Sequence, residues 1–424
     1  MLQISSLRCL DALYSPRLDS SKLRNWRKWG RSPLQVFLTV LMAGCLSLTG
    51  LVSPAYAANA QLTWLETPTD NPIGTSAFRQ ATAPQVWQFP QDFGAHEDYQ
   101  TEWWYYTGNL ETAAGRPFGF QLTFFRQALM PPDQQPITPS SHWRSRQVYS
   151  AHLTVSDIAD RQFYPYERFS RGNVNLAGAT AAPYQVWLED WSAAEISPGV
   201  VQLRAQTAEI VLDLQVTQSL PPILQGDRGF SIKGLEPGNA SYYYSLVQQP
   251  TTGKITINDN HYEVTGLTWK DHEYSTSSLS SGTVGWDWFS MQFDNGSALM
   301  LYLLRHDDGT PESTSAGTYI TATGETQPLN AQDWQIKILD TWQSPQSKAI
   351  YPAQWTIAIP KLDLTLQGKP LMPNQELNTA TATYWEGAVA FQGSSQHQPI
   401  QGKGYVELTG YADRLDTLLS ARTP

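Results

Sequence analysis

Acidic residues stand repeatedly among aromatic ones in this chain of 424 residues, and the sharpest instance is Asp287. It lies in the alternating run Trp286 to Phe293 and shares the phase of the run's apolar residues, so we expect its side chain on a buried face. A lone carboxylate there is costly unless it is protonated or paired. Because desolvation raises the pKa of a carboxyl group, Asp287 is a candidate general acid. The plainer alternative is a structural acid bonded to an indole N–H or an arginine.

A second group of titratable residues is the triplet Asp271-His272-Glu273. If the segment is extended, Asp271 and Glu273 point to one face and His272 to the other. The histidine could shuttle protons, or bind a metal with help from His96 or His152, but a hydrogen-bonded turn is the commoner explanation of such a triplet. We predict no metal site. The candidate catalytic residues are Asp287, Asp271, His272 and Glu273.

A third acid, Glu102, has aromatic partners in its alternation phase. We expect it to fix the structure through a buried pair with an arginine such as Arg126, and catalysis is the alternative. Glu386 and Glu407 stand in comparable aromatic segments. For both of these acids we expect the same role of holding strands together.

Buried acids surrounded by rings suit the protonation of an unactivated double bond. The ring faces attract a developing carbocation by about 0.5–2 kcal/mol each, and a protonated carboxyl group can supply the proton. An apolar, aromatic lining also favours an apolar ligand. The residues that we predict to contact this ligand are Glu102, Trp103, Trp104, Tyr105, Phe120, Phe124, Arg126, Trp286, Trp288, Trp385, Glu386 and Tyr405.

The elements that must position these residues are short alternating runs bounded by Gly, Pro, Asn and Asp, which predict β-strands and almost no helix. In the run 118–124 every second residue is large and apolar, so we expect one buried face. We predict an all-β chain of roughly 16–20 strands in two tandem antiparallel barrels, each able to hold one small ligand. A short helix is expected at 412–421. Further strands are expected at 148–155, 200–216, 254–257, 286–293, 299–304, 355–359, 388–391 and 404–411.

The N-terminal segment has the pattern of a secretory signal. Several basic residues precede an apolar run from Leu34, and the small-x-small site Ala55-Tyr56-Ala57 follows. We expect cleavage after Ala57 and an exported protein, periplasmic or luminal; a lipoprotein anchored through Cys45 is the alternative. Cys9 and Cys45 are the only cysteines, so a chain cleaved after Ala57 has no thiol chemistry. The predicted organisation is 1–57 signal peptide, 58–83 extended lead-in, 84–278 first barrel domain and 279–424 second barrel domain.

The charge balance limits the partners. The formal net charge is −10, and removal of residues 1–57 would leave 21 basic and 36 acidic residues. This sign disfavours binding to nucleic acid phosphates and to anionic lipid headgroups. We therefore expect an apolar small-molecule partner and no nucleic acid, while a peripheral association with a membrane stays open.

Three longer motifs resemble a known family. They are His96-Glu97-Asp98-Tyr99 with Glu102 to Leu110 and Gly119 to Arg126; Trp269 to Ser275 with Gly285 to Phe289; and Tyr384 to Gly387 with Gly404 to Tyr411. Over about residues 84–415 the chain resembles the lipocalin-like AttH family, a distant relative of the carotenoid 1,2-hydratases, also called hydroxyneurosporene synthases. The resemblance implies two calycin-type barrels side by side. For the hydratase branch it implies addition of water to an acyclic carotenoid without an external cofactor.

The leading hypothesis is an exported protein that binds an apolar isoprenoid, carotenoid or lipid-like ligand and hydrates or isomerises it as a cofactor-independent hydro-lyase. A carrier without catalysis is the first alternative, and a carbohydrate-active β-protein is the second. We find no phosphate-binding loop, dinucleotide fingerprint or serine-hydrolase elbow. Export itself argues against a carotenoid biosynthetic step, which is expected at the inner face of a membrane.

Overall fold

The computed structural model describes residues 78–132, 145–276, 280 and 282–412. The predicted signal segment, both cysteines, most of the predicted lead-in and all but the first residue of the predicted helix at 412–421 lie outside these ranges. Within them, helix is limited to three short 3-10 turns: η2 (Gln91–Phe93), η3 (Ala331–Asp333) and η4 (Pro360–Leu362). No helix in these ranges has the length and apolar character needed to cross a membrane.

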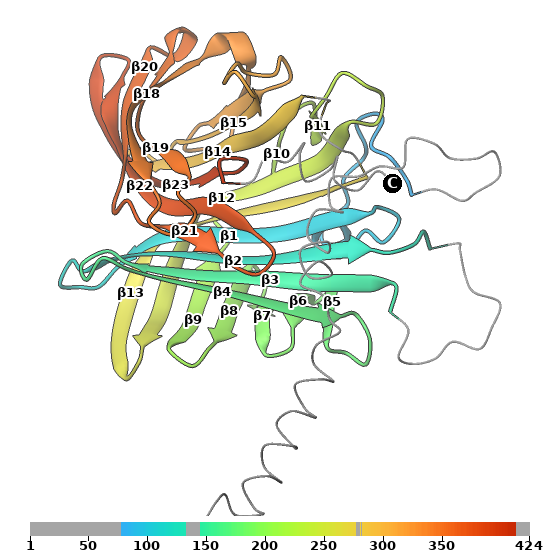
Figure 1. The fold of residues 1–424 in the computed structure, drawn as a ribbon. Helices are drawn as coiled ribbons and strands as arrows, with labels where there is room; N and C mark the ends of the chain where they lie inside the picture. Colours follow the sequence, from blue (N-terminus) through green and yellow to red (C-terminus); the bar gives the residue numbers. More distant parts are fainter. Residues whose placement is uncertain (1–77, 133–144, 277–279, 281, 413–424) are drawn as a thin grey trace, which may run out of the picture. The chain divides into compact units, whose positions relative to one another are not determined.

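The first sheet has thirteen antiparallel strands in the described ranges and curls on itself (Figure 1). Its main path runs β4-β3-β2-β1-β13-β12-β9-β8-β7-β6-β5, and β10 and β11 also pair with β12. The strands are β1 (Thr101–Glu111), β2 (Pro117–Ala128), β3 (Gln147–Asp157), β4 (Gln162–Arg171), β5 (Ala177–Ala181), β6 (Tyr184–Leu188), β7 (Trp191–Ser197), β8 (Val200–Gln206), β9 (Ile210–Thr217), β10 (Ile223–Leu224), β11 (Phe230–Ile232), β12 (Ala240–Ile257) and β13 (Asn260–Ser275).

The second sheet has ten antiparallel strands in the described ranges and is curled in the same way (Figure 1). Its main path runs β17-β16-β15-β14-β23-β22-β20-β19-β18, and β21 pairs with β22. The strands are β14 (Thr283–Phe293), β15 (Ala298–His306), β16 (Ala316–Ile320), β17 (Thr326–Asn330), β18 (Gln335–Gln343), β19 (Ile350–Ile359), β20 (Leu364–Pro370), β21 (Glu376–Asn378), β22 (Thr383–Ser395) and β23 (Gln398–Leu408).

The all-β prediction of two barrel-like antiparallel sheets with little helix is confirmed, and the described part of the chain has 23 strands where 16–20 were expected. Each predicted run overlaps one or two strands: 200–216 forms the hairpin of β8 and β9, and 404–411 extends three residues past the end of β23. The excess comes from short strands such as β10, β11 and β21, which are too brief to show a period in the sequence.

The buried face expected for 118–124 is confirmed, and the opposite face of β2 is buried as well. Its inner face packs in the core of the first sheet, where Phe120 and Leu122 are fully buried. Its outer face packs on the second sheet, so closely that a Cβ at Gly119 would lie 2.8 Å from the Ala388 Cβ. The outer face carries Gly119, Gln121 and Thr123, small and polar residues that in the sequence resemble a solvent-facing side, so alternation does not reveal that this face is also covered.

The buried side chains form three main cores. One fills the inside of the first sheet, one fills the inside of the second, and the third joins the outer faces of the two. We call this third core the seam. It is built by β1, β2, β12 and β13 on one side and mainly β14, β15, β22 and β23 on the other. Its aromatic residues include Tyr105, Tyr243, Trp269, Trp288, Tyr302 and Tyr405.

Candidate functional site

Four carboxyl groups meet in the seam, and we call them the seam acids: Asp271, Glu273, Glu386 and Glu407. Asp271 and Glu273 project from the outer face of β13, where alternation puts them on one side. Glu386 of β22 and Glu407 of β23 lie directly opposite each other in the register of the second sheet. One strand of the first sheet and two strands of the second therefore bring Asp271 and Glu273 close to two acids that follow them by more than a hundred residues.

Asp271 is fully surrounded by neutral donors. Its Oδ1 accepts hydrogen bonds from the Ser245 hydroxyl at 2.5 Å and the Trp269 indole N–H at 2.6 Å, and its Oδ2 accepts one from Tyr243 at 2.6 Å. Burial raises the pKa of Asp271 to about 7, although these three hydrogen bonds favour its charged form. Asp271 can therefore hold or release a proton near neutral pH.

Glu407 and Glu386 have fewer donors than Asp271. Glu407 accepts a hydrogen bond from the Trp286 indole at 2.9 Å, and burial together with the nearby Asp271 and Glu273 raises its pKa to about 7. Glu386 is fully buried and accepts its short bond, at 2.6 Å, from the Tyr105 hydroxyl. Burial and the neighbouring Glu407 raise the pKa of Glu386 well above its usual range. Neutral donors alone do not keep these carboxyl groups ionised.

Glu273 is the seam acid that has a cation. The ammonium group of Lys233 lies 3.1 Å from Glu273 and 4.0 Å from the centre of the Tyr302 ring. Burial works against the charge of Lys233, but Glu273 raises the pKa of this lysine above its usual value. The site thus combines one ion pair with three carboxyl groups whose pKa is raised.

Aromatic rings enclose the seam acids. The Tyr105 and Trp288 rings meet edge to face with centroids 5.1 Å apart, and the Trp288 indole donates a hydrogen bond to Tyr243 at 3.2 Å. Trp103 and Trp286 are only partly buried, as is Glu407. The acids are therefore closest to solvent on the side of these two tryptophans, next to ring faces that can stabilise a cation.

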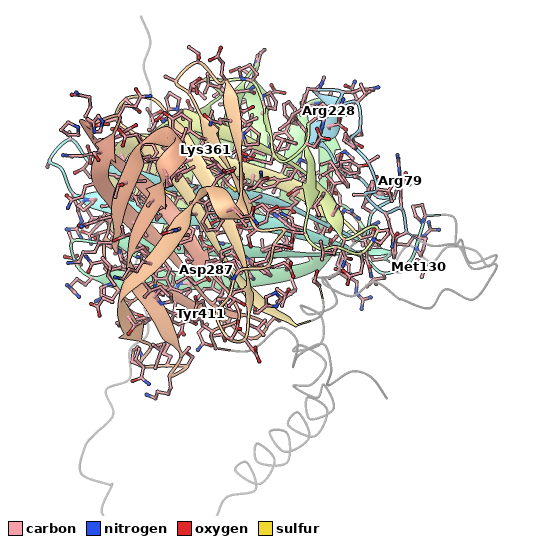
Figure 2. The ribbon with its side chains drawn as sticks, turned by 90° about the horizontal axis from the view of Figure 1, so that it is seen from above. Arg79, Met130, Arg228, Asp287, Lys361 and Tyr411 are labelled. Carbon is pink, nitrogen blue, oxygen red and sulfur yellow. The ribbon has the colours of Figure 1, made fainter. Side chains whose placement is uncertain are left out.

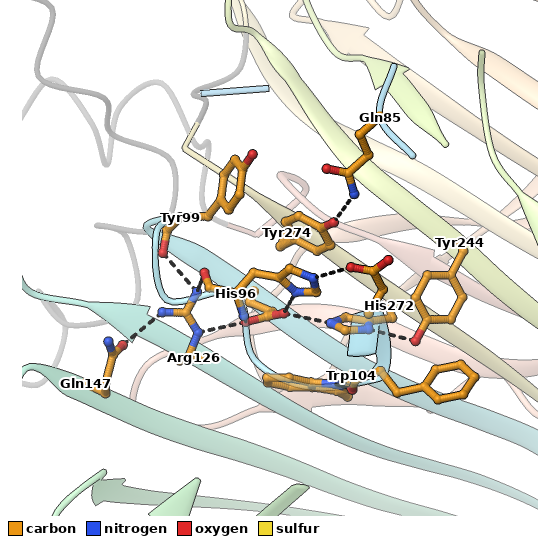
Figure 3. A network of polar contacts seen from close by, with 12 residues as sticks. Gln85, His96, Tyr99, Trp104, Arg126, Gln147, Tyr244, His272 and Tyr274 are labelled. Carbon is orange, nitrogen blue, oxygen red and sulfur yellow. Dashed lines mark hydrogen bonds and ion pairs between the residues drawn. The ribbon is translucent and has the colours of Figure 1, made fainter. Parts of the chain in front are cut away.

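A second acid network lies inside the first sheet and is centred on Glu102 (Figure 3). The predicted pair with Arg126 is confirmed, with 2.8 Å between Arg126 Nε and Glu102 Oε2 and both side chains fully buried. His96 Nδ1 lies 2.7 Å and His272 Nε2 lies 2.8 Å from Glu102 Oε1. Although burial favours the neutral acid, Arg126 and His96 hold the pKa of Glu102 well below its usual range.

The hydrogen-bonded turn favoured for Asp271-His272-Glu273 is wrong, because all three residues lie in the strand β13, and the division expected for an extended segment is confirmed. His272 points into the first sheet, where its ring stacks on Trp104 and its Nδ1 lies 2.8 Å from the Tyr244 hydroxyl (Figure 3). Asp271 and Glu273 face the seam, where they contact Tyr243 and Lys233. Burial lowers the pKa of His272 to about 4, so the ring is neutral.

The three donor groups His96, Glu102 and His272 converge closely enough to hold a metal ion, with ligand atoms within 4.8 Å of one another. The same atoms already bond to each other, and Arg126 neutralises Glu102. Burial opposes charge on His96, but Glu102 and Asp92 raise its pKa to about 9, which makes this ring a charged donor between two carboxylates. The network is complete without an ion.

Asp287 lies on the buried face predicted for it, inside the second sheet with Phe289 and Met291. Its Oδ1 is 3.3 Å from Arg305 Nε, and the Tyr411 hydroxyl lies 3.0 and 3.1 Å from its two oxygens (Figure 2). Burial raises its pKa, and Arg305 opposes that rise. This arrangement matches the structural alternative weighed for Asp287, and its predicted catalytic role stays a prediction.

The residues predicted to contact a ligand fall into two groups. One group is in the cores inside the sheets: Glu102, Trp104, Phe120, Phe124, Arg126 and Trp385. The other group faces the seam: Trp103, Tyr105, Trp286, Trp288, Glu386 and Tyr405. The rings inside both sheets are buried, whereas Trp103 and Trp286 at the edge of the seam are only partly buried, so the edge of the seam is the better candidate for a ligand.

Sequence reasoning missed several residues of the site. Tyr243, Ser245 and Lys233 were not singled out, and Glu407 was assigned only to strand locking. Lys270 was missed as well: it is buried inside the first sheet with its ammonium group 4.2 Å from the Tyr184 ring, and burial lowers its pKa to about 7. The signal available for Glu407 was its alternation with Tyr405, but the register that places it beside Glu386 is not visible in one sequence.

Comparisons with known proteins agree with this architecture. A crystal structure of a candidate AttH from Nitrosomonas europaea is 35% identical, with a TM-score of 0.69, and the match covers 78% of this chain and 99% of that one. Kievitone hydratase of Fusarium solani subsp. phaseoli is 23% identical over 303 residues, covering 65% of this chain and 84% of the hydratase. A dehydratase of Emericella nidulans is 22% identical over 218 residues, covering 49% of this chain and 60% of that protein.

The family described as AttH-like matches residues 80–411, which include both sheets, the seam acids and the Glu102 network. The chain therefore belongs to the AttH-like family.

Proposed function

We propose that this protein catalyses the addition of water to a carbon–carbon double bond of an apolar small molecule, or the reverse elimination, at the seam acids. The observation that carries the proposal is the pair Asp271 and Glu407, two carboxyl groups with a pKa of about 7 among aromatic rings. Such a pair can supply one protonated and one ionised group at the same pH. Two relatives bear the names hydratase and dehydratase, which describe the two directions of this reaction.

In the proposed hydration, the Asp271 O–H bond breaks and its proton forms a C–H bond with one alkene carbon. The other carbon becomes a cation, which the rings of Trp286 and Trp288 stabilise. A water molecule forms the new C–O bond and gives a proton to the Glu407 carboxylate. Proton exchange between the two acids and solvent restores the starting state, so the residues of the chain supply all the acid–base chemistry.

We infer that the substrate is an isoprenoid, an acyclic carotenoid or a lipid-like alkene, because aromatic and aliphatic side chains line the seam around the acids. The proposal includes export through removal of residues 1–57. A carrier that binds the same ligand without reaction is the second candidate, and the filled hydrogen bonds of Asp271 favour it.

The test uses purified protein with farnesol, lycopene and a mixed prenyl alcohol pool in water enriched in oxygen-18. We expect a product heavier by one labelled water, and we expect Asp271→Asn to reduce its rate by about 100-fold or more while ligand quenching of tryptophan fluorescence persists. The exposed Asp259→Asn is the matched control and keeps full activity.

The outcomes separate the candidates. Labelled product that vanishes in Asp271→Asn but not in Asp259→Asn supports hydration at the seam. Loss in folded Asp287→Asn with full activity in Asp271→Asn would move the reaction to the inside of the second sheet. Binding by wild-type protein with no labelled product from any of these alkenes would end the hydratase proposal in favour of a carrier.

A further inference from the structure

A groove of about 620 Å³ lies between the two sheets, away from the seam acids. Its floor is the outer face of the second sheet, and its wall is the end of β1 and the turn-side part of β13. Its volume is within the range of ligand sites. Six of its lining residues carry carboxamides: Asn109, Gln292, Gln354, Gln367, Gln392 and Gln401.

The strand register arranges three of these amides in a row. Gln367 of β20 lies opposite Gln392 of β22, which lies opposite Gln401 of β23. Neighbouring strands are about 4.8 Å apart, so the row spans about 10 Å. All three side chains are exposed, so their amide groups face solvent on the floor of the groove.

Two further amides are fixed where the floor meets the wall. Asn109 is buried and donates a hydrogen bond to the Gly404 carbonyl at 2.9 Å, which ties β1 to β23. Gln292 is also buried, and its Oε1 accepts a hydrogen bond from the Gln248 backbone N–H at 2.6 Å. The groove therefore has a rigid inner corner and an exposed row of donors and acceptors.

The charges of the groove balance. Lys403 is paired with Glu111 at 2.8 Å, and Lys369 and Asp294 add one charge of each sign. An anionic or cationic ligand thus finds no excess of the opposite charge. An apolar ligand would cover the amides without bonding to them, at a cost of about 1–3 kcal/mol for each buried unpaired group.

We propose that this groove binds a neutral saccharide. Each carboxamide offers both a donor and an acceptor, as each sugar hydroxyl does, so a polyhydroxylated chain can satisfy the row without any net charge. Groups that bond a ligand hydroxyl also reject analogues that lack it. The site is separate from the proposed hydration site, and no catalysis is assigned to it.

The experiment is affinity electrophoresis and calorimetry of the full chain with maltohexaose, cellohexaose, xylohexaose and N-acetylated chitohexaose. We expect at least one of them to bind, and the double variant Gln367→Ala/Gln392→Ala to weaken that binding tenfold or more. The control, Gln327→Ala/Gln335→Ala, removes two exposed glutamines that do not line the groove and leaves binding unchanged.

Because the four substituted glutamines are exposed, we expect both variants to fold, and circular dichroism checks that they do. The proposal is overturned if none of the four oligosaccharides binds, or if the groove variant and the control bind equally well. The alkene assay does not involve the groove, so neither result affects the test of the hydration proposal.

Discussion

Each of the two buried acid networks of this protein contains a fully buried glutamate, and the pKa values of these two glutamates are shifted in opposite directions. Glu102, inside the first sheet, is bonded to Arg126 and to a charged His96, and its pKa is held well below the usual range. Glu386, in the seam, is equally buried, but its short bond comes from the neutral Tyr105 and its pKa is raised well above that range. Burial alone therefore does not fix the charge; the partner does.

The same difference indicates which carboxyl groups serve the structure and which could take part in proton transfer. A carboxylate with fixed cations stays ionised and resists proton transfer, whereas a carboxyl group near its pKa exchanges protons readily. Asp287 is intermediate, with Arg305 beside it and a pKa that burial still raises. The comparison ranks the seam acids first as proton donors and Glu102 last.

The largest effect is expected from removing the cation of the Glu102 network. Arg126→Met leaves a buried carboxylate without its strongest partner, and we expect a loss of about 3–5 kcal/mol in the free energy of unfolding. Urea denaturation at pH 7 measures it. Lys254→Met, which breaks the exposed pair with Glu263, is the control and should cost less than about 1 kcal/mol. Equal losses in the two variants would show that burial of the pair is unimportant.

A smaller effect is expected in the pH dependence of stability. The pKa of Asp271 is raised from 3.8 to about 7 on folding. Its contribution to the free energy of unfolding is therefore complete below about pH 4 and is lost as the pH rises to about 7. The stability of wild type relative to Asp271→Asn should fall by on the order of 1 kcal/mol per pH unit in this window. Chemical denaturation at several pH values provides the measurement. A difference that is independent of pH, or that grows with pH, would mean that Asp271 is ionised in the folded protein.

The smallest effect is expected for neutral replacement of Glu386. Burial and Glu407 raise the pKa of Glu386 well above its usual range and so favour its neutral form. Glu386→Gln then keeps a neutral group of the same shape next to Tyr105, and stability at pH 7 should change by less than about 1 kcal/mol. Glu102→Gln removes a charge that Arg126 needs and should cost several-fold more. Thermal unfolding measures the loss of stability in both variants. A larger loss in Glu386→Gln than in Glu102→Gln would contradict the comparison.

Much of this architecture was predictable from the sequence. Alternation located strands such as β2, β3 and β14, placed Asp287 on a buried face and separated His272 from Asp271, but it found only the end of β12 and not β13. The Glu102–Arg126 pair could be predicted because a buried acid needs a cation and Arg126 is near in sequence.

The seam could not be predicted in the same way. Alternation says that Glu386 and Glu407 lie on the outer face of a strand, but an outer face normally meets solvent. Only the packing of one sheet on the other turns these faces into a third core and brings Glu407 close to Asp271. The partners of Asp287, Arg305 and Tyr411, depend on register in the same way.

The protonation state of the seam acids tests the account most directly. Infrared spectroscopy of the protonated carboxyl C=O band at pH 6 measures it, because ordinary Asp and Glu residues are ionised at that pH. We predict bands from wild type that lose intensity in Asp271→Asn, Glu386→Gln and Glu407→Gln, and no loss in Glu102→Gln. Intensity lost in Glu102→Gln, with none lost in the three seam variants, would contradict the account.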